Sequence, residues 1–216
     1  MSKFLAPIHT CIFNKIKLYE NLEANLVKAY TKQYGQEACS LYNEIKEKYG
    51  TPLEDRPIEE LIDVSNIHGW LQNKISITES RQAELLTKLI NKYCEEVKNI
   101  ALKLYAQQGS KCGKEAKEKY DATNASTIYK ALNDYILEGM PCDRVNSITE
   151  NTEDKLEWEN EMCLHKGYWD AVSGDVKLFY ELRDAWIKSF VENINDNFSY
   201  IPYRDMATFE IIKNQL

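Results

Sequence analysis

The strongest constraint on the fold is a change in the spacing of apolar residues near residue 140. Before it, apolar side chains recur every three or four positions, which is the spacing of one face of an amphipathic helix. After it, residues 155–163 alternate between apolar and acidic side chains, which is typical of a half-exposed strand. Together the two spacings predict an α+β fold, in which an N-terminal helical layer is followed by a small antiparallel sheet.

Helices are predicted throughout the first region, residues 1–139. Their approximate ranges are 12–34, 38–49, a short segment after Pro57, 78–106, 113–121 and 126–138. Gly35 is expected to end the first of them. Ser76 and Glu79 have the spacing of a capping box for the longest helix, and Gly109 is expected just beyond its C-terminus.

The second region, residues 140–216, is predicted to contain strands and helices in the order β-β-α-α-β-β. In its alternating segment, Leu156 and Trp158 share one face and glutamates occupy the other. The expected elements are strands 144–150 and 155–163, helices 164–172 and 174–194, and strands 198–203 and 208–212, the last two joined around Arg204-Asp205. We expect one four-stranded sheet with helices on one face, and one compact domain formed by both regions.

A short similarity links Gly35–Ala38 to Gly113–Ala116. Four residues are too few to define a repeat. We interpret the similarity as a glycine that ends one helix, followed by acidic residues that favour the N-terminus of the next.

Composition excludes several classes of partner. The formal net charge is −7 and the isoelectric point is about 5.2, so a basic surface for nucleic acid or for an anionic membrane is not expected. No segment approaches the ~20 apolar residues of a membrane span. The stretch 4–12 lacks the features of a signal peptide, so we expect a cytoplasmic protein. Abundant Lys, Asn, Ile and Tyr suggest an AT-rich bacterial genome.

The pattern of cysteines and histidines predicts neither a metal nor a cofactor. The six cysteines contain no C-x-x-C pair, and in a reducing cytosol they are expected to be thiols. His9 and His68 are isolated in the sequence. A metal bound by His68, His165, Cys163 and a carboxylate has no ligand spacing to support it. Glycine-rich nucleotide-binding motifs are also missing from the sequence.

The densest group of chemically active residues lies between positions 163 and 184. Cys163 is predicted at the end of a strand and just before a helix, where the helix dipole stabilises a thiolate. His165 then serves as the base, because imidazole titrates near neutral pH. The alternative is that Cys163 is a small buried apolar residue and His165 a surface residue.

Three charged residues complete the predicted catalytic group. Asp175 or Asp184 would orient the base His165. Arg183 would hold a substrate carboxylate through two parallel hydrogen bonds. Arg183 and Asp184 can instead belong to the polar surface of the long C-terminal helix.

Aromatic residues near this group are predicted to bind the substrate. They are Trp158, Trp169 and Tyr180. Tryptophans at such spacing also occur in ordinary hydrophobic cores, so the core alternative stays open. Cys142, in the loop before Asp143 and Arg144, belongs either to an active site or to a solvated turn.

The order of elements resembles the L-2-amino-thiazoline-4-carboxylic acid hydrolase family and, more distantly, small-molecule-binding domains of the vinyl-reductase type. The resemblance rests on the segment Tyr34–Ala38, Cys163 at a strand end, Gly174, Asp184 and the terminal hairpin 200–212. It covers about the last two-thirds of the chain. It implies a pocket for a small molecule, with Cys163 as the candidate nucleophile.

Two departures from the family pattern bear on the substrate. The helix after Gly174-Asp175 reads Tyr180-Glu181-Leu182-Arg183-Asp184 and lacks the second cysteine often seen there. The last hairpin, residues 206–210, lacks the family's Gly-Asp-x-x-Cys element. The resemblance therefore implies the scaffold more than the substrate.

These observations predict a cysteine-dependent enzyme that acts on a small polar molecule, by hydrolysis or rearrangement at a C–N or C–S bond. The alternative is a non-enzymatic small-molecule-binding or sensor domain, whose pocket would be lined by the aromatic residues. A third possibility is a helical scaffold subunit that forms a homo-oligomer through its wide apolar helix faces.

Overall fold

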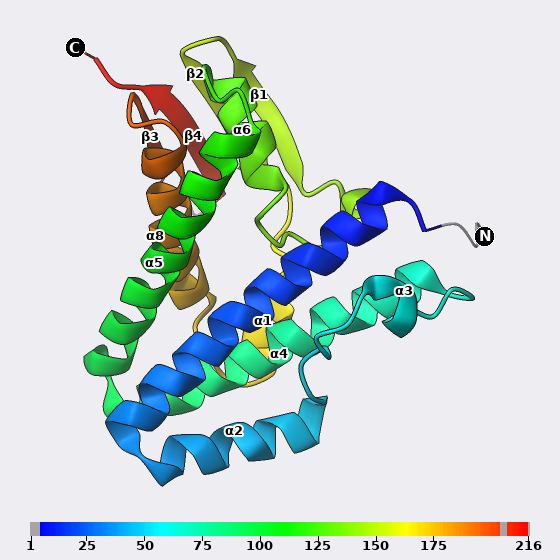
Figure 1. Ribbon diagram of the computed structural model, residues 1–216. Helices are drawn as coiled ribbons and strands as arrows, with labels where there is room; N and C mark the ends of the chain where they lie inside the picture. The colour runs from blue at the N-terminus through cyan, green and yellow to red at the C-terminus, as the bar shows by residue number, and fades with distance from the viewer. Residues whose placement is uncertain (1–4, 204–206, 216) are drawn as a thin grey trace. The chain divides into compact units, whose positions relative to one another are not determined.

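A computed structural model describes residues 5–203 and 207–215. The predicted α+β class is confirmed: helices occupy the N-terminal part, and the strands and helices of the C-terminal part follow the order β-β-α-α-β-β (Figure 1). The described residues form two compact units, and each is described by itself. Unit 1 contains residues 5–100, 139–141 and 165–175; unit 2 contains residues 101–138, 142–164, 176–203 and 207–215.

Unit 1 is built around one long central helix. Its elements are α1 (Pro7–Tyr34), α2 (Gln36–Tyr49), α3 (Ile58–Leu61), α4 (Ile67–Tyr93), the first turns of α5 (Glu95–Lys119) and α7 (Lys166–Asp170). Helices α1 and α2 pack against α4 and against each other, and α7 also packs on α4 (Figure 1). Because neighbours surround α4, its polar side chains on these faces must find partners inside the protein.

The longest predicted helix, 78–106, is wrong in its boundaries. Helix α4 begins eleven residues earlier, at Ile67, where the Asn66 side chain accepts a hydrogen bond from the Gly69 amide. Ser76 and Glu79 therefore lie inside α4 and form no capping box. The helix ends at Tyr93, and α5 begins at Glu95, so the break falls in the middle of the predicted helix.

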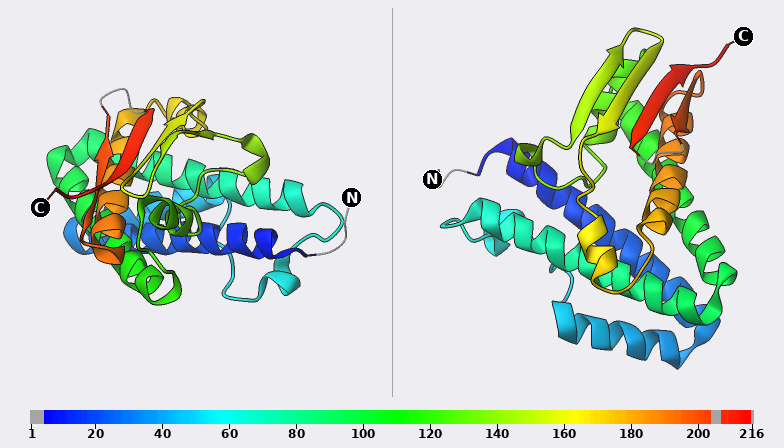
Figure 2. Two further views of the ribbon diagram at one scale, coloured as in Figure 1. Left: turned by 90° about the horizontal axis from the view of Figure 1, so that it is seen from above. Right: turned by 180° about the vertical axis from the view of Figure 1, so that it is seen from behind.

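Unit 2 is a sheet with helices packed against it. It contains most of α5, α6 (Ala125–Asn133), β1 (Asn146–Asn151), β2 (Lys155–Asn160), α8 (Val176–Ile194), β3 (Phe198–Pro202) and β4 (Thr208–Lys213). A short 3-10 turn, η1 (Pro141–Asp143), precedes β1. The antiparallel strands lie in the order β1-β2-β4-β3, with α8 against β3 and α6 against β2 and β4 (Figure 2). The turn predicted at Arg204-Asp205 lies outside the described residues.

The predicted alternation along β2 is confirmed by the register of the sheet. Trp158 is opposite Phe209, and Leu156 is opposite Ile211; all four side chains are buried. On the other face, Lys155 forms ion pairs with Glu150, Glu157 and Glu210. The strand ends at Asn160, earlier than predicted, and Met162 beyond its end is exposed.

Gly109 lies inside α5 and does not end a helix. A Cβ at this position would be 2.1 Å from the backbone oxygen of Trp186 in α8. Glycine is needed here because two helix backbones approach closely. This requirement differs from the one at the C-terminus of a helix, where glycine allows a positive φ.

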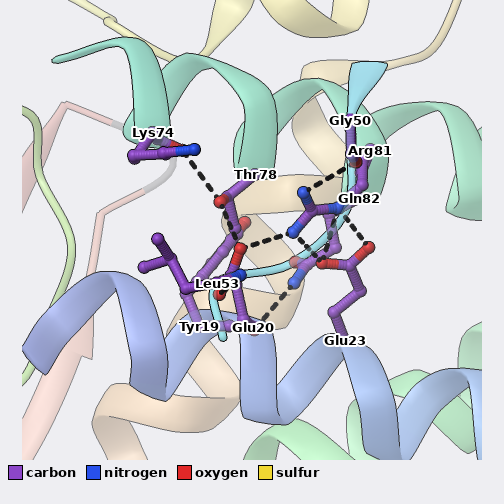
Figure 3. A network of polar contacts seen from close by, with 9 residues as sticks. All are labelled: Tyr19, Glu20, Glu23, Gly50, Leu53, Lys74, Thr78, Arg81 and Gln82. Carbon is purple, nitrogen blue, oxygen red and sulfur yellow. Dashed lines mark hydrogen bonds and ion pairs between the residues drawn. The ribbon is translucent and has the colours of Figure 1, made fainter. Parts of the chain in front are cut away.

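A buried ionic network joins α1 to α4 (Figure 3). The Arg81 guanidinium is fully buried and donates to both oxygens of Glu23, at 2.9 and 3.0 Å, and to Glu20 at 2.7 Å. It also donates to the backbone oxygen of Gly50 at 3.1 Å. The second oxygen of Glu20 accepts from the Leu53 amide, so the network also fixes the loop after α2.

The network holds two carboxylates but one guanidinium. Burial raises the pKa of the Glu23 carboxyl, and Arg81 opposes that rise. Burial lowers the pKa of the Arg81 guanidinium, whereas its partners Glu23 and Glu20 raise it. The net shift is upward. The cation is therefore firmly charged, and its presence makes it possible to bury the two acids.

Helices α1 and α4 carry two copies of one sequence pattern, residues 8–37 and 67–96, offset by 59 residues without a gap. Ten of the thirty positions are identical: Ile8 and Ile67, His9 and His68, Asn14 and Asn73, Lys15 and Lys74, Ile16 and Ile75, Glu20 and Glu79, Ala24 and Ala83, Leu26 and Leu85, Tyr34 and Tyr93, and Glu37 and Glu96. This similarity extends over thirty positions, whereas the similarity between Gly35–Ala38 and Gly113–Ala116 covers four.

Equivalent residues of the two copies meet in space. The rings of Tyr34 and Tyr93 stack with centroids 3.9 Å apart. The Tyr34 hydroxyl donates to Glu96, and the Tyr93 hydroxyl donates to Glu37, so the two bonds are reciprocal. Equivalent histidines also meet at the other end of the helix pair, so α1 and α4 run parallel (Figure 1). Reciprocal contacts of this kind are the signature of a two-fold relation.

The helix breaks also correspond between the copies. Gly35, between α1 and α2, has φ 66° and ψ −145°; Cys94, between α4 and α5, has φ 51° and ψ −133°. Only glycine adopts this backbone conformation at low cost. The second copy therefore holds a strained cysteine where the first has glycine.

We expect Arg81→Met to lower the free energy of unfolding by about 3–5 kcal/mol, because it leaves two buried carboxylates without their cation. Urea unfolding followed by circular dichroism measures the change. The control is Arg56→Met, since Arg56 forms ion pairs at the surface and its loss is expected to change stability little. A loss below about 1 kcal/mol for Arg81→Met would contradict the role given to the network.

We expect Cys94→Gly to raise the free energy of unfolding by about 1 kcal/mol, because it relieves the positive φ at the break. The reverse change, Gly35→Ala, is expected to destabilise the protein. Apart from Gly35 and its two chain neighbours, no described residue comes within 4 Å of a Cβ placed there, so the backbone conformation alone would cause that loss. Equal stability of the wild type and Cys94→Gly in urea would show that this conformation carries no strain.

Candidate functional site

Cys163 and Tyr180 form the centre of the candidate site in unit 2. Cys163 is exposed, so its alternative as a buried apolar residue is wrong. The buried Tyr180 hydroxyl, on α8, donates a hydrogen bond to the Cys163 sulfur at 3.1 Å. Burial, and then the neighbouring thiol, raise the pKa of Tyr180, so the phenol keeps its proton and remains a donor. A fixed donor of this kind stabilises a thiolate relative to a thiol.

The two charged residues of α8 are engaged inside unit 2. Arg183 is buried, donates to the backbone oxygen of Leu137 at 3.2 Å and forms an ion pair with Glu138. Its alternative as a surface residue is therefore wrong. Asp184 accepts a hydrogen bond from the Tyr200 hydroxyl at 2.6 Å. Burial raises the pKa of Asp184, although the bond from Tyr200 opposes the rise.

Trp158 lies in an aromatic cluster between the sheet and the helices of unit 2. Its ring is 4.8 Å from Tyr129, 5.5 Å from Phe209 and 6.1 Å from Tyr200, measured between centroids. The side chain is buried, as the core alternative predicts. Any contact between Trp158 and a substrate stays a prediction.

Two half-buried asparagines in unit 2 carry buried polar atoms that are incompletely bonded. Asn146 and Asn160 are cross-strand neighbours in β1 and β2. Within the described residues, Oδ1 of Asn146 and both amide atoms of Asn160 lack a hydrogen bond of normal geometry. The Asn160 amide is still close enough to Tyr180 to lower the pKa of that phenol. Buried polar atoms of this kind cost about 1–3 kcal/mol each when no partner satisfies them.

The other predicted site residues, His165, Trp169 and Asp175, belong to unit 1. His165 is at the N-terminus of α7 and is only 2% exposed, so its alternative as a surface residue is wrong. Trp169 is also buried, whereas Asp175 is exposed. The catalytic roles of His165 and Asp175 stay predictions.

The carboxylate next to His165 belongs to Glu79, which the sequence interpretation did not include in the site. Glu79 Oε1 lies 3.2 Å from His165 Nδ1, and both side chains are 2% exposed. The two residues are far apart in the chain, so no local spacing links them. One signal was available: Glu79 occupies an apolar stripe of α4, four residues from Ile75 and four from Ala83.

His9 and His68, which look isolated in the sequence, meet in unit 1. The Ala6 amide donates to Nδ1 of His9 at 3.1 Å, so the proton of the neutral ring is on Nε2. That nitrogen is 3.2 Å from Nε2 of His68, which therefore accepts the bond. Burial and the neighbouring His68 lower the pKa of His9. The pair is thus a hydrogen bond in which His9 donates and His68 accepts.

Comparisons with known proteins do not identify the chain: no family model, curated protein or solved structure matches it. Across residues 5–203 and 207–215, no helix is long and apolar enough to cross a membrane. Over the same residues, no group of three or more His, Cys, Asp or Glu side chains has the arrangement of a metal site.

The histidine pair predicts a dependence of stability on pH. Because the pKa of His9 is lower in the folded state, its contribution to stability is complete above the unfolded pKa of about 6.5 and is lost as the pH falls below it. In His68→Gln, the amide oxygen still accepts the bond but does not titrate. We expect the unfolding free energy of this variant to fall less between pH 7.5 and 5.5. Parallel curves for the variant and the wild type would contradict the pairing.

Proposed function

We propose that the chain is a cysteine-dependent enzyme that hydrolyses or rearranges a C–N or C–S bond of a small polar molecule, with Cys163 as the nucleophile. The observation that carries the proposal is the hydrogen bond from the buried Tyr180 hydroxyl to an exposed thiol. Exposure allows a substrate to reach the sulfur, and a thiolate in general accepts a hydrogen bond more strongly than a thiol does. The resemblance to the L-2-amino-thiazoline-4-carboxylic acid hydrolase family supports the same class of reaction.

The proposed reaction has two steps. The Cys163 thiolate attacks an electrophilic carbon, a new C–S bond forms, and the departing nitrogen or sulfur takes a proton. Water then attacks the covalent intermediate, which releases the product and restores the thiol. His165 is retained as the proton-transfer group because it follows Cys163 by two positions in the sequence.

Arg183 has a more limited role in this proposal. Its guanidinium is already bound to Leu137 and Glu138. To bind a substrate carboxylate, it would have to exchange one carboxylate partner for another. We therefore assign substrate binding first to the aromatic and amide groups of unit 2, and to Arg183 only through such an exchange.

A second candidate function is the binding of a small polar ligand without chemistry. The incompletely bonded amides of Asn146 and Asn160 favour it, because a ligand with both donors and acceptors would satisfy them. Native mass spectrometry of the purified protein tests this function. A bound molecule that is recovered unchanged, and is held equally by the wild type and Cys163→Ala, would favour binding over catalysis.

The enzyme proposal predicts that iodoacetamide modifies Cys163 faster at pH 6 than the other exposed cysteines, Cys94 and Cys142. These two are internal controls in the same sample. Mass spectrometry of each cysteine between pH 5 and 9 measures the rates. Tyr180→Phe removes the donor and is expected to slow the reaction of Cys163 at pH 6 about tenfold, the effect of one hydrogen bond to a charged group.

Two results would count against the proposal. Cys163 would be no nucleophile if its rate followed those of Cys94 and Cys142 across the whole pH range. The Tyr180 hydroxyl would be irrelevant if Tyr180→Phe left the Cys163 rate unchanged while the control cysteines also kept theirs.

A further inference from the structure

The internal repeat places two glutamates at equivalent positions, Glu20 in α1 and Glu79 in α4. Both are buried between helices of unit 1. A buried carboxylate needs a cationic or hydrogen-bonding partner, because the loss of water is otherwise very costly. The partners of the two glutamates can therefore be compared directly.

The two copies meet this need differently. Glu20 binds Arg81 of the other copy, at 2.7 Å. The position equivalent to Arg81 in the first copy is Leu22, which is buried and has no charge to offer. Glu79 is instead next to His165, a residue from outside the repeat, at 3.2 Å. A titratable ring thus takes the place of a permanently charged guanidinium.

Glu79 also has fewer hydrogen-bond partners than Glu20, the equivalent residue of the first copy. Oε1 of Glu20 accepts from Arg81 and Thr78, and its Oε2 accepts from the Leu53 amide. Within the described residues, Oε2 of Glu79 has no hydrogen-bond partner. A carboxylate kept for stability alone would be expected to have both oxygens satisfied, as Glu20 does. The ring of His165 is therefore the polar group in contact with the Glu79 carboxylate.

We propose that Glu79 is the positioning residue of His165, and this inference rests on the proposed function, in which His165 transfers the proton. A carboxylate next to Nδ1 favours the tautomer with the proton on that nitrogen. The lone pair of Nε2 is then available to take a proton. The contact also holds the ring in one orientation, because both side chains are buried.

Glu79 takes the role of the acid that orients His165. That role was expected for Asp175 or Asp184. Asp175 is exposed, and the Asp184 carboxylate is engaged by Tyr200 within unit 2. Glu79 is the acid whose contact with the His165 ring is observed.

The test is ¹⁵N NMR of the His165 ring in the full chain, which reports the nitrogen that carries the proton. In the wild type at pH 8 we expect the proton on Nδ1. In Glu79→Gln we expect the Nδ1 tautomer to lose its predominance, because an amide can serve as donor or acceptor. The shorter Glu79→Asp retains the charge and is expected to restore much of the wild-type signal, which also covers the case in which Glu79→Gln folds poorly.

The matched control is Glu84→Gln on the same helix. Glu84 is a buried acid that binds Lys48, Lys88 and Tyr49, and its loss is expected to leave the His165 tautomer unchanged. The inference is overturned if Glu79→Gln keeps the wild-type ring signal, or if Glu84→Gln changes it as strongly.

A second measurement separates this inference from the proposed function. The rate of Cys163 alkylation at pH 6 is compared in the wild type, Glu79→Gln and His165→Asn. A loss of about tenfold in both variants, equivalent to one pKa unit, supports both proposals. The other outcome is a changed tautomer in Glu79→Gln while both variants are alkylated at the wild-type rate. Glu79 would then still position the His165 ring, but His165 would have no part in the chemistry of Cys163.

Discussion

The buried guanidinium of Arg81 is the interaction on which the arrangement of unit 1 most depends. It joins Glu20 and Glu23 of α1 to α4 and also binds the backbone at Gly50. Apolar packing alone leaves two long helices free to slide or rotate, whereas directional hydrogen bonds from Arg81 to two buried acids define one position. Such a network is costly to bury, so its worth lies in selecting one arrangement more than in adding stability.

The network also marks the place where the two copies of the helical pattern diverge. At both ends of the α1–α4 pair, equivalent residues meet: His9 with His68 and Tyr34 with Tyr93. In the middle, one copy contributes Arg81 and the other Leu22. This asymmetry leaves Glu79 without an arginine and brings it a histidine. Proteins commonly place functional groups where a regular pattern is broken, because the regular part supplies the stability.

Much of the fold follows from local patterns, and the exceptions have identifiable causes. The order of strands and helices after residue 140 is predicted correctly, because β2 is buried on one face and its alternation is clear. The break at Cys94 is missed, because a cysteine gives no signal for a backbone that usually requires glycine. Gly109 is misassigned because a close helix contact and a C-cap favour the same residue. In the candidate site, Cys163 is predicted from its position in the sequence, whereas Glu79 is not.

The sequence by itself determined the class of fold, the positions of most elements and the candidate nucleophile, since each depends on spacings of a few residues. The sequence also contains the repeat of α1 and α4. Only one position in three is identical between the copies, so the repeat does not stand out as a local motif. Only the tertiary structure decided which side chains meet: Tyr180 with Cys163, Glu79 with His165, and Arg81 with its two acids. These pairs join residues that are 17 to 86 positions apart in the chain. Chain folding brings them together, and no local spacing encodes them.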